Sequence, residues 1–391
     1  MLDFGWVAVG PVLSSLLAEF GAEVIKVESS RRLDYARMIP SPLREEEAAL
    51  EAWESRREEI DRVGVFHQYN RGKRGVTVDL RHPGAPGLLK RLVARCDVVV
   101  ENFSPRVLRE RGLEYEALRA VRPDLVMISC SAAGAGGPWE DLKTFAPSLS
   151  SLAGLERLIG YQGERVLGAL TFGYADPSNA QHGLFAVLAA LWHRERTGEG
   201  QWIDMSQLEA TVGLGGEALL DHFMNGRVWG TQGATHLSLA PHGVYPCAES
   251  ASESALPWVA IACQSNAEWE TLAALLGDGE APGDRFRVDD ERIARFTRRH
   301  PAEWVSEQCQ ALGIASCPVL GLAAHADHPH FRARGLLDRG LYTSPIKLSA
   351  TPGRIDGPAP ALGADNRRVF QDLLGLSDSE FSEFVASGVI R

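Results

Sequence analysis

The sequence predicts an α/β protein with a doubly wound parallel sheet, followed by a smaller α+β domain. Two observations predict it. In the first half of the chain, short apolar segments rich in β-branched residues alternate with segments of helical periodicity. The strand segments are apolar at successive positions, as in strands buried on both faces. From residue 225 onward, glycine, proline and serine become frequent and short alternating segments replace this pattern.

The chain opens with a strand, a helix and a second strand. Residues Met1–Phe4 resemble the end of a buried strand, and an apolar helical segment runs over Val12–Phe20. Pro11 stands near the first turn of this helix and Gly21 at its end, where each residue type is favoured. The second strand is Val24–Glu28. This order is typical of a parallel sheet with crossover helices.

The same alternation continues to about residue 224. Residues 41–64 interrupt it with a densely charged segment that has few apolar anchors, which indicates a solvated surface helix. The further predicted strands are Val76–Leu80, Asp97–Glu101, Leu125–Ser131 and Gln201–Met205. The further predicted helices are Pro86–Arg95, one opening at Arg106, Tyr115–Val121, a long helix from Pro177, and Gln207–Met224.

The second half is expected to hold a small domain and a returning tail. We divide the chain into residues 1–215 (first part of the large domain), 216–330 (small α+β domain with linkers) and 331–391 (C-terminal segment). The small domain has an alternating strand at Trp258–Ala262 and helices at Glu268–Leu276 and Ala302–Leu312. Two tail helices, Arg367–Leu374 and Ser377–Val385, are expected to dock on the large domain.

Composition excludes several classes of protein. The 391 residues are 45% hydrophobic, enough for a sizeable core, and the net charge of -11 argues against a nucleic-acid partner. The six cysteines form no CxxC pair and no Cys/His metal spacing, which favours reduced thiols in the cytoplasm and no metal site. No segment has the pattern of a secretion signal or is apolar over a membrane's thickness, so we expect no membrane association.

A ligand site is expected at the carboxyl ends of the strands, where open α/β sheets bind ligands. The loops there contain Gly10-Pro11, Asn102-Phe103 and Ser131–Gly137. No GxGxxG motif and no P-loop follows the first strand, which disfavours a nicotinamide-dependent dehydrogenase and an NTPase. The absence of a GxSxG elbow disfavours an α/β-hydrolase.

Asp176 precedes Pro177 and a long helical segment, so it is expected at a helix N-terminus. Apolar residues recur through that segment at helical spacing. The commoner meaning of this pattern is a cap, in which the carboxylate accepts hydrogen bonds from free backbone N–H groups. The alternative is a catalytic nucleophile, with backbone donors nearby to hold developing negative charge. The two roles are compatible.

Four cations stand next to predicted strand ends or helix starts. They are Lys73, Arg74, Arg106 and Lys143. Taken singly, each of these side chains is most simply explained as an ordinary charged residue on the surface. Their shared position relative to the sheet indicates that together they hold phosphate groups.

Several segments of the chain together resemble a known family. The segments that carry the resemblance are Gly21–Glu28, Asn70–Asp79, Val100–Phe103, Ser129–Pro138, Gly173–Ala210 and Ser377–Ile390. They are similar, in order and over nearly the whole chain, to the class III CoA-transferases. That family includes formyl-CoA transferase, carnitine-CoA transferase and relatives of α-methylacyl-CoA racemase.

The resemblance implies a large Rossmann-like domain, a small domain, and a homodimer whose chains interlock, or a heteromer with a related subunit. It implies coenzyme A and its thioesters as substrates, a carboxylic acid as the second substrate, and no tightly bound cofactor. It also implies that Asp176 is the catalytic residue. The residues on positions that contact CoA would be Ala8, Lys73, Arg74, Asn102, Phe103, Arg106, Lys143 and Phe145.

The implied reaction moves CoA from an acyl-CoA donor to a free acid through an aspartyl anhydride and an aspartyl-CoA thioester. A carboxylate suits this chemistry because its mixed anhydride activates the acid without ATP. Two alternatives stay open: an acyl-CoA racemase or isomerase of the same fold, and a non-catalytic CoA-binding partner subunit. Against the racemase, Trp139-Glu140-Asp141 lacks the histidine that the racemases carry. Ala8 and Ser29 replace larger polar residues of formyl-CoA transferase, which argues against a small polar site for oxalate or formate. Trp6 and Ala8 indicate a roomier, more apolar acyl pocket.

Overall fold

The computed structural model describes residues 1–38, 60–168, 173–249 and 255–391. Most of the predicted surface helix at 41–64 lies outside these residues. The chain divides into two compact units. The first is made of Met1–Glu156, Ala169–Arg227 and Asp338–Arg391, and the second of Arg157–Gly168 and Val228–Leu337.

The predicted parallel sheet of the first unit is confirmed. It has six strands in the order β3-β2-β1-β4-β5-β6, and every neighbouring pair is parallel. The strands are β1 (Leu2–Asp3), β2 (Ile25–Glu28), β3 (Arg74–Thr77), β4 (Val98–Glu101), β5 (Val126–Ser129) and β6 (Trp202–Asp204). Leu2 pairs with Ile25 on one side and with Val99 on the other, so the opening residues of the chain form the centre of the sheet.

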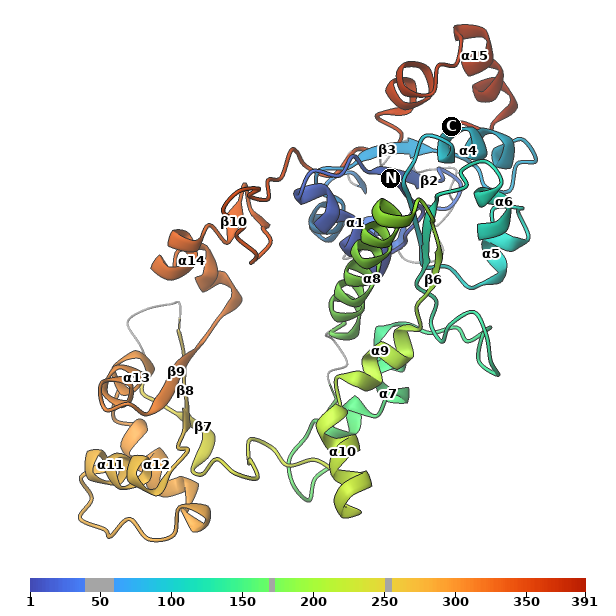
Figure 1. Ribbon diagram of the computed structural model, residues 1–391. Coiled ribbons are helices and arrows are strands. Elements are labelled where there is room, and N and C mark those ends of the chain that lie inside the picture. Colours follow the sequence, from blue (N-terminus) through green and yellow to red (C-terminus); the bar gives the residue numbers. More distant parts are fainter. Residues whose placement is uncertain (39–59, 169–172, 250–254) are drawn as a thin grey trace. The chain divides into compact units, whose positions relative to one another are not determined.

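Helices cover both faces of this sheet. Figure 1 shows α1 and α8 on one side and α4, α5 and α6 on the other. A Cβ atom at Gly183 of α8 would lie 2.6 Å from Leu13 of α1, so the glycine permits close packing of these two helices. The helices on the two faces are α1 (Val9–Glu19), α8 (Ala175–Thr197), α4 (Ala85–Val93), α5 (Arg106–Arg109) and α6 (Tyr115–Arg119).

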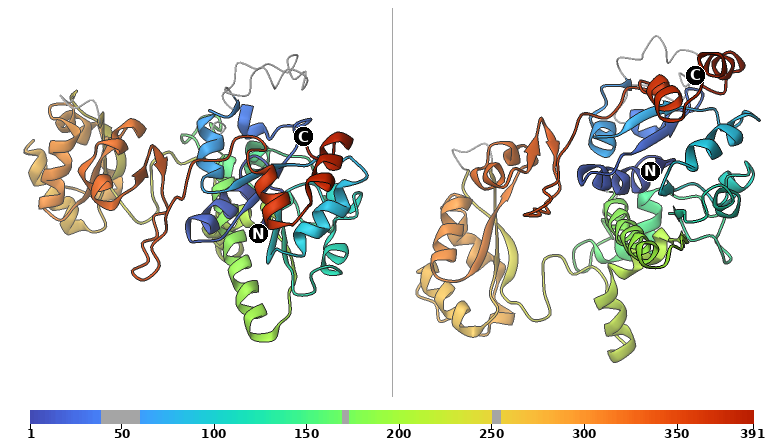
Figure 2. Two further views of the ribbon diagram at one scale, coloured as in Figure 1. Left: turned by 90° about the horizontal axis from the view of Figure 1, so that it is seen from above. Right: turned by 45° about the horizontal axis from the view of Figure 1, so that its top comes forward.

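The C-terminal segment packs within the first unit. It forms η7 (Arg368–Leu373) and α15 (Asp378–Ser387), and Figure 2 shows it beside the sheet in both views. Phe370 and Phe381 belong to the same buried cluster as residues of β1 to β5. The backbone N–H of Thr77 donates to the side-chain oxygen of Asn366 at 2.8 Å. The tail therefore completes the core beyond the sheet's β3 edge.

The second unit contains a three-stranded antiparallel sheet in the order β7-β8-β9. Its core contains Trp269 and Val259 together with other buried apolar residues. The strands are β7 (His242–Pro246), β8 (Ala255–Ala262) and β9 (Ala315–Leu320). The helices are α11 (Asn266–Leu276), η5 (Arg285–Arg287), α12 (Asp290–Thr297), α13 (Ala302–Ala311), η6 (Leu322–Ala326) and α14 (Pro329–Arg334).

The prediction of a single helix over Gln207–Met224 is wrong. The segment forms α9 (Gln207–Gly213) and α10 (Gly216–Asn225), separated by Leu214 and Gly215. Three glycines within four residues make the middle of the segment costly to keep helical.

The remaining elements are η1 (Tyr35–Met38), α3 (Gly64–Asn70), α7 (Ala146–Leu152), η4 (Leu155–Leu158), β10 (Leu337–Asp338) and β11 (Leu341–Tyr342). None of the helices within the described ranges is long and apolar enough to cross a membrane.

Candidate active site

A pocket of about 400 Å³ lies at the carboxyl end of the sheet. The strand order reverses between β1 and β4, and such a reversal point is where open α/β sheets bind ligands. The loop after β1 (residues 6–9) and the loop after β4 (residues 102–105) both line the pocket. Of the loops on which the sequence placed the ligand site, Asn102, Phe103 and Ala132 line this pocket, whereas Gly10 and Pro11 do not.

Asp176 lies in the first turn of α8 and lines the same pocket. The residue before the helix is Tyr174, and α8 begins one residue before Asp176. Among the described residues, the carboxylate of Asp176 accepts no hydrogen bond, so its interpretation as a helix cap is wrong. Burial raises the pKa of Asp176 to about 6. The carboxylate is thus near a helix N-terminus, as expected, but it faces the pocket instead of the backbone.

Hydrogen bonds from both sides fix the loop after β1. The N–H of Trp6 donates to Asn102 Oδ1 at 2.6 Å, and Asn102 Nδ2 donates back to the Trp6 carbonyl at 2.9 Å. Val7 has a left-handed backbone with φ of 60°, a strained conformation for a β-branched residue. Its N–H donates to Asp34 Oδ1 at 2.9 Å. Asn102, one of the predicted site residues, therefore holds the loop and also lines the pocket.

A buried ion pair supports this loop from below. The ammonium group of Lys26 lies 2.9 Å from Asp34 Oδ2, and both side chains are fully buried. Lys26 also donates to the carbonyl of Gly5 at 2.6 Å. Because the pair bonds to the backbone on both sides of Trp6, it sets the path of the chain into the pocket.

The predicted apolar contacts all line the pocket. Ala8 is buried just before α1, Phe103 follows β4, and Phe145 is exposed just before α7. The rings of Phe103 and Trp6 meet edge to face, with centroids 6.2 Å apart. These side chains give the pocket one apolar wall next to the carboxylate of Asp176.

The four predicted cations are not brought together. Lys143 is exposed and lines the pocket, whereas Arg106 lies on the exposed side of α5, outside the lining, and pairs with Asp141. Lys73 and Arg74 come just before or at the start of β3, so they lie at the amino edge of a parallel sheet. The expectation that all four share a position relative to the sheet is therefore wrong.

Lys73 and Arg74 have carboxylate partners of their own. The buried ammonium group of Lys73 donates to Asp3 Oδ2 and to the Pro11 carbonyl, each at 2.8 Å. Burial lowers the pKa of Lys73 to about 8. Arg74 pairs with Glu23, and both Lys73 and Arg74 line a different pocket.

Two residues near Asp176 were missed from the sequence. Arg32 lines the pocket, with its guanidinium 4.6 Å from the centre of the Trp6 ring. The sequence could have indicated Arg32, because this residue comes just after β2 and that strand also ends at the pocket edge. Tyr69 of α3 neighbours the carboxylate, since burial and then the charge of Asp176 raise the pKa of Tyr69. Nothing local in the sequence indicates that second proximity.

A comparison with protein families identifies the family of the chain. The profile described as CoA-transferase family III matches residues 1–366. The chain belongs to CoA-transferase family III. It is therefore a CoA-transferase, as the resemblance implied.

Relatives support the same assignment. Succinyl-CoA–D-citramalate CoA-transferase of Chloroflexus aurantiacus is 31% identical, over 100% of this chain and 96% of the relative. The alpha subunit of succinyl-CoA–L-malate CoA-transferase from the same organism is 29% identical, over 100% of this chain and 91% of that subunit. The crystal structure of a CaiB/BaiF family protein from Brucella suis matches with a TM-score of 0.81 and 27% identity, covering 95% and 97% of the two chains.

The ionisable side chains that line the pocket of this CoA-transferase indicate which chemistry the pocket supports. Its ionisable side chains are Arg32, Glu140, Lys143 and Asp176, and the lining includes no histidine from the described part of the chain. A carboxylate with a raised pKa and two cations are suited to nucleophilic attack on a thioester attached to an anionic carrier.

Proposed function

We propose that this family III CoA-transferase moves CoA from an acyl-CoA donor to a free carboxylic acid through covalent intermediates on Asp176. The observation that carries the proposal is the carboxylate itself. It lies at the point where the strand order reverses, partly buried, without a hydrogen-bond partner among the described residues, and its pKa of about 6 leaves it mainly ionised at neutral pH. An anion that is poorly solvated and open to a pocket is a reactive nucleophile.

The first half of the reaction forms the enzyme thioester. A carboxylate oxygen of Asp176 attacks the thioester carbonyl of the donor, the C–S bond breaks, and CoA leaves as the thiolate. The thiolate then attacks the Asp176 carbonyl of the mixed anhydride. The donor acid leaves as its carboxylate, and aspartyl-CoA remains.

The second half transfers CoA to the acceptor. The acceptor carboxylate attacks the aspartyl carbonyl and displaces the thiolate, which forms a second mixed anhydride. The thiolate attacks the acceptor carbonyl, releases the new acyl-CoA and restores the Asp176 carboxylate. No proton is taken up or released, so this cycle requires no general base.

CoA enters this scheme as substrate, and we propose no tightly bound cofactor. Lys143 lines the pocket and Arg106 lies on nearby α5, so these two cations are our candidates for the phosphates of CoA. Phe103, Phe145 and Ala8 would contact the pantetheine arm. For Lys73 and Arg74, phosphate binding would compete with their existing ion pairs to Asp3 and Glu23.

We further propose succinyl-CoA as the donor and a small hydroxy acid or dicarboxylic acid as the acceptor. Two relatives that cover the whole chain are named for succinyl-CoA, with D-citramalate or L-malate as the other substrate. The guanidinium of Arg32 would pair with the second carboxylate of such an acid. A panel of acids assayed with succinyl-CoA tests this choice, and activity confined to other donors would contradict it.

The covalent mechanism is tested by trapping. With an acyl-CoA donor, hydroxylamine should give a hydroxamate at Asp176 that is visible by mass spectrometry of the peptides. D176N should lose at least about 10³-fold in kcat. Glu195 is an exposed carboxylate on the same helix, and E195Q is the matched control that should keep full activity.

Two other outcomes would replace the proposal. Deuterium incorporation next to the thioester, without CoA exchange or an adduct, would indicate a racemase. That reaction calls for two bases, and the pocket lining offers one other carboxylate, Glu140. CoA binding with neither exchange nor deuteration would indicate a non-catalytic partner subunit.

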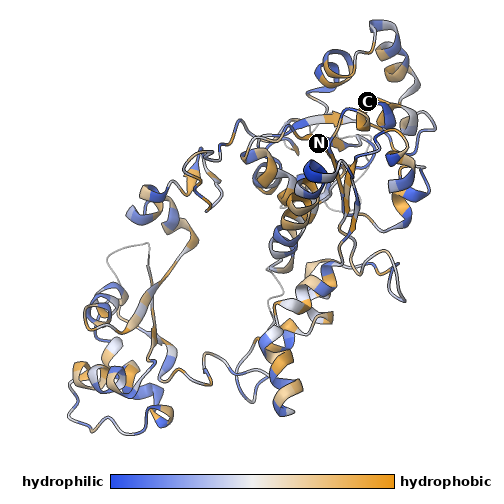
Figure 3. Cartoon of the chain, in the orientation of Figure 1, coloured by the Kyte–Doolittle hydropathy of each residue, from blue (hydrophilic) through white to orange (hydrophobic). Residues whose placement is uncertain are grey.

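We also propose that the enzyme works as an interlocked homodimer or with a related subunit, in the cytoplasm. The exposed side of α8 carries Phe185, Leu188 and Trp192, which are 76%, 50% and 63% exposed. Figure 3 shows apolar residues recurring along this helix. A chain that leaves such a stripe exposed gains stability by covering it.

The six cysteines are all unpaired, which suits a reducing compartment.

A further inference from the structure

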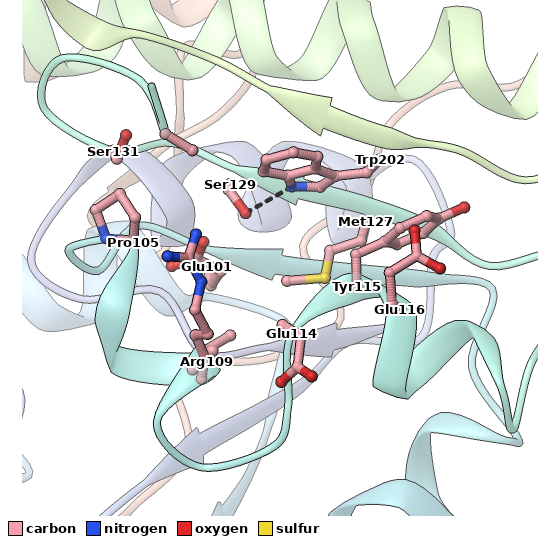
Figure 4. Close-up of a pocket in the computed structure, with 12 residues that line it drawn as sticks. Glu101, Pro105, Arg109, Glu114, Tyr115, Glu116, Met127, Ser129, Ser131 and Trp202 are labelled. Carbon is pink, nitrogen blue, oxygen red and sulfur yellow. Dashed lines mark hydrogen bonds between the residues drawn. The ribbon is translucent and has the colours of Figure 1, made fainter. Parts of the chain in front are cut away.

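A second pocket, of about 220 Å³, lies on the other face of the sheet. Side chains alternate between the two faces along β4: Val98 and Val100 pack in the cluster that contains residues of α1 and α8, whereas Val99 packs in the cluster on the opposite face. Glu101 therefore points away from α8 and into the second pocket. Figure 4 shows this pocket between α5, α6 and the strands.

The walls of this pocket are largely apolar and aromatic. Met127 and Leu108 form part of them, together with the rings of Tyr115 and Trp202. The indole N–H of Trp202 donates to the Ser129 hydroxyl at 3.0 Å, which fixes the orientation of the ring (Figure 4). A volume below the usual range for drug-sized ligands fits a small metabolite.

Two polar groups in the pocket lack hydrogen-bond partners among the described residues. Ser131 is 3% exposed, and its hydroxyl makes no hydrogen bond with any residue that the structure describes. One carboxylate oxygen of Glu114 is likewise buried and unbonded within the described chain. Burial of unbonded polar atoms costs free energy, of the order of 1–3 kcal/mol each, and a ligand that bonds to them recovers it.

The charges of the pocket have both signs. Glu101 is 4% exposed, and its Oε2 accepts a hydrogen bond from the Phe103 N–H at 2.7 Å. Burial raises the pKa of Glu101 to about 7. Arg109 also lines the pocket and forms no ion pair with the described residues. In Figure 4, Arg109 lies on the same side as Glu101, and Glu116 lies on the opposite side.

We propose that this pocket binds a small zwitterion with an apolar side chain, the chemistry of an α-amino acid such as phenylalanine or leucine. Its carboxylate pairs with Arg109 and accepts from the Ser131 hydroxyl. Its ammonium group donates to Glu101 and Glu114, and its side chain packs against Trp202. The ligand thereby meets the unbonded oxygens of Ser131 and Glu114, the buried carboxylate of Glu101, the guanidinium of Arg109 and an apolar wall.

The proposal is tested by calorimetric titration of the full chain with three matched probes. L-phenylalanine carries both charges, phenethylamine lacks the carboxylate and 3-phenylpropanoate lacks the ammonium group. We expect L-phenylalanine to bind at least about tenfold more tightly than either analogue, since each lost charged hydrogen bond weakens binding by that order. The acid analogue is also a carboxylate that the Asp176 pocket would accept, so the variants below identify the site.

Two variants locate the binding. E101Q and R109Q should each weaken L-phenylalanine binding by about tenfold or more. The matched controls are E110Q and R119Q, which change exposed residues of the same region outside the pocket and should bind like the wild type. Because Arg109 is exposed, R109Q remains informative if E101Q does not fold. No binding, equal binding of phenethylamine, or equal binding by E101Q and R109Q would overturn the proposal.

Discussion

Asp176 is subject to two opposing influences. The N-terminus of α8 favours the anion through the helix dipole, and removal from water favours the neutral acid. The pKa of about 6 shows that burial has the larger effect. The side chain is still ionised at neutral pH, but with weaker solvation than an aspartate in water. These are the properties that a carboxylate nucleophile requires.

The pH dependence of the reaction follows from this pKa. The protonated acid is a poor nucleophile, so kcat/KM should be constant above about pH 7 and fall tenfold per unit below about pH 6. Initial rates of CoA exchange between pH 4.5 and 8 measure this limb. An acid limb centred near pH 4, the range of an ordinary aspartate, would contradict the burial argument.

The same pKa predicts that the nucleophile destabilises the fold. The folded pKa is raised above 3.8, so ionised Asp176 costs stability above about pH 6, and the cost fades as the pH falls toward 4. D176N should therefore raise the free energy of unfolding at pH 7 by about 1–2 kcal/mol, after allowance for partial exposure. Thermal melts at pH 7 and pH 4 test this. A gain that is equal at both pH values would show another cause.

At the scale of elements, the loop after β1 connects the centre of the sheet to the pocket. Residues 6–9 leave β1, include the left-handed Val7, and enter α1. Asn102 binds the loop from the β4 side, and the Lys26–Asp34 pair binds it from the β2 side. A strained backbone persists where its surroundings hold it in this way. The loop is therefore a positioning element for the pocket wall that faces Asp176.

Breaking the supporting ion pair should affect both stability and turnover. D34N leaves the Lys26 ammonium buried without its counter-ion and should cost about 3–5 kcal/mol of stability. The double variant K26M/D34L removes both charges and should regain most of that stability. Its kcat/KM should stay low, because Val7 N–H and the Gly5 carbonyl still lack their partners. Full recovery of activity in the double variant would show that the pair does not position the loop.

At the scale of the whole molecule, the exposed apolar residues of α8 support the proposed assembly. Phe185, Leu188 and Trp192 recur at helical spacing on the side of α8 that the first unit leaves uncovered. The opposite side, with Ala180 and Val187, is buried against the sheet. One helix thus has a core face and an apolar outer face, which is typical of a subunit interface.

A charge placed on that outer face should disrupt the assembly. F185E should convert an oligomer of the wild type to a monomer, measured by light scattering after gel filtration at micromolar concentration. His193 is exposed on the same helix, and H193E is the matched control that should leave the mass unchanged. A wild type that is monomeric, or an F185E variant with the wild-type mass, would exclude this face as the interface.

The parallel sheet was predictable because strands buried on both faces must be apolar at successive positions, a local property of the sequence. The glycine-rich break between α9 and α10 was also present in the sequence, but the apolar periodicity on either side concealed it. The cap interpretation of Asp176 failed for a different reason. Capping depends on which residue takes the first helical conformation, and Tyr174 and Ala175 determine that together with the surrounding chain.

The sequence by itself determined the alternation of strands and helices, the position of Asp176 near a helix start and the membership of a CoA-transferase family. Only the tertiary structure decided which side chains share the pocket. It placed Arg32 beside Trp6 and moved Lys73 to a buried bond with Asp3. The reason is physical: periodicity and turn residues are set within a few positions, whereas the register and order of parallel strands bring together residues that are far apart in the chain.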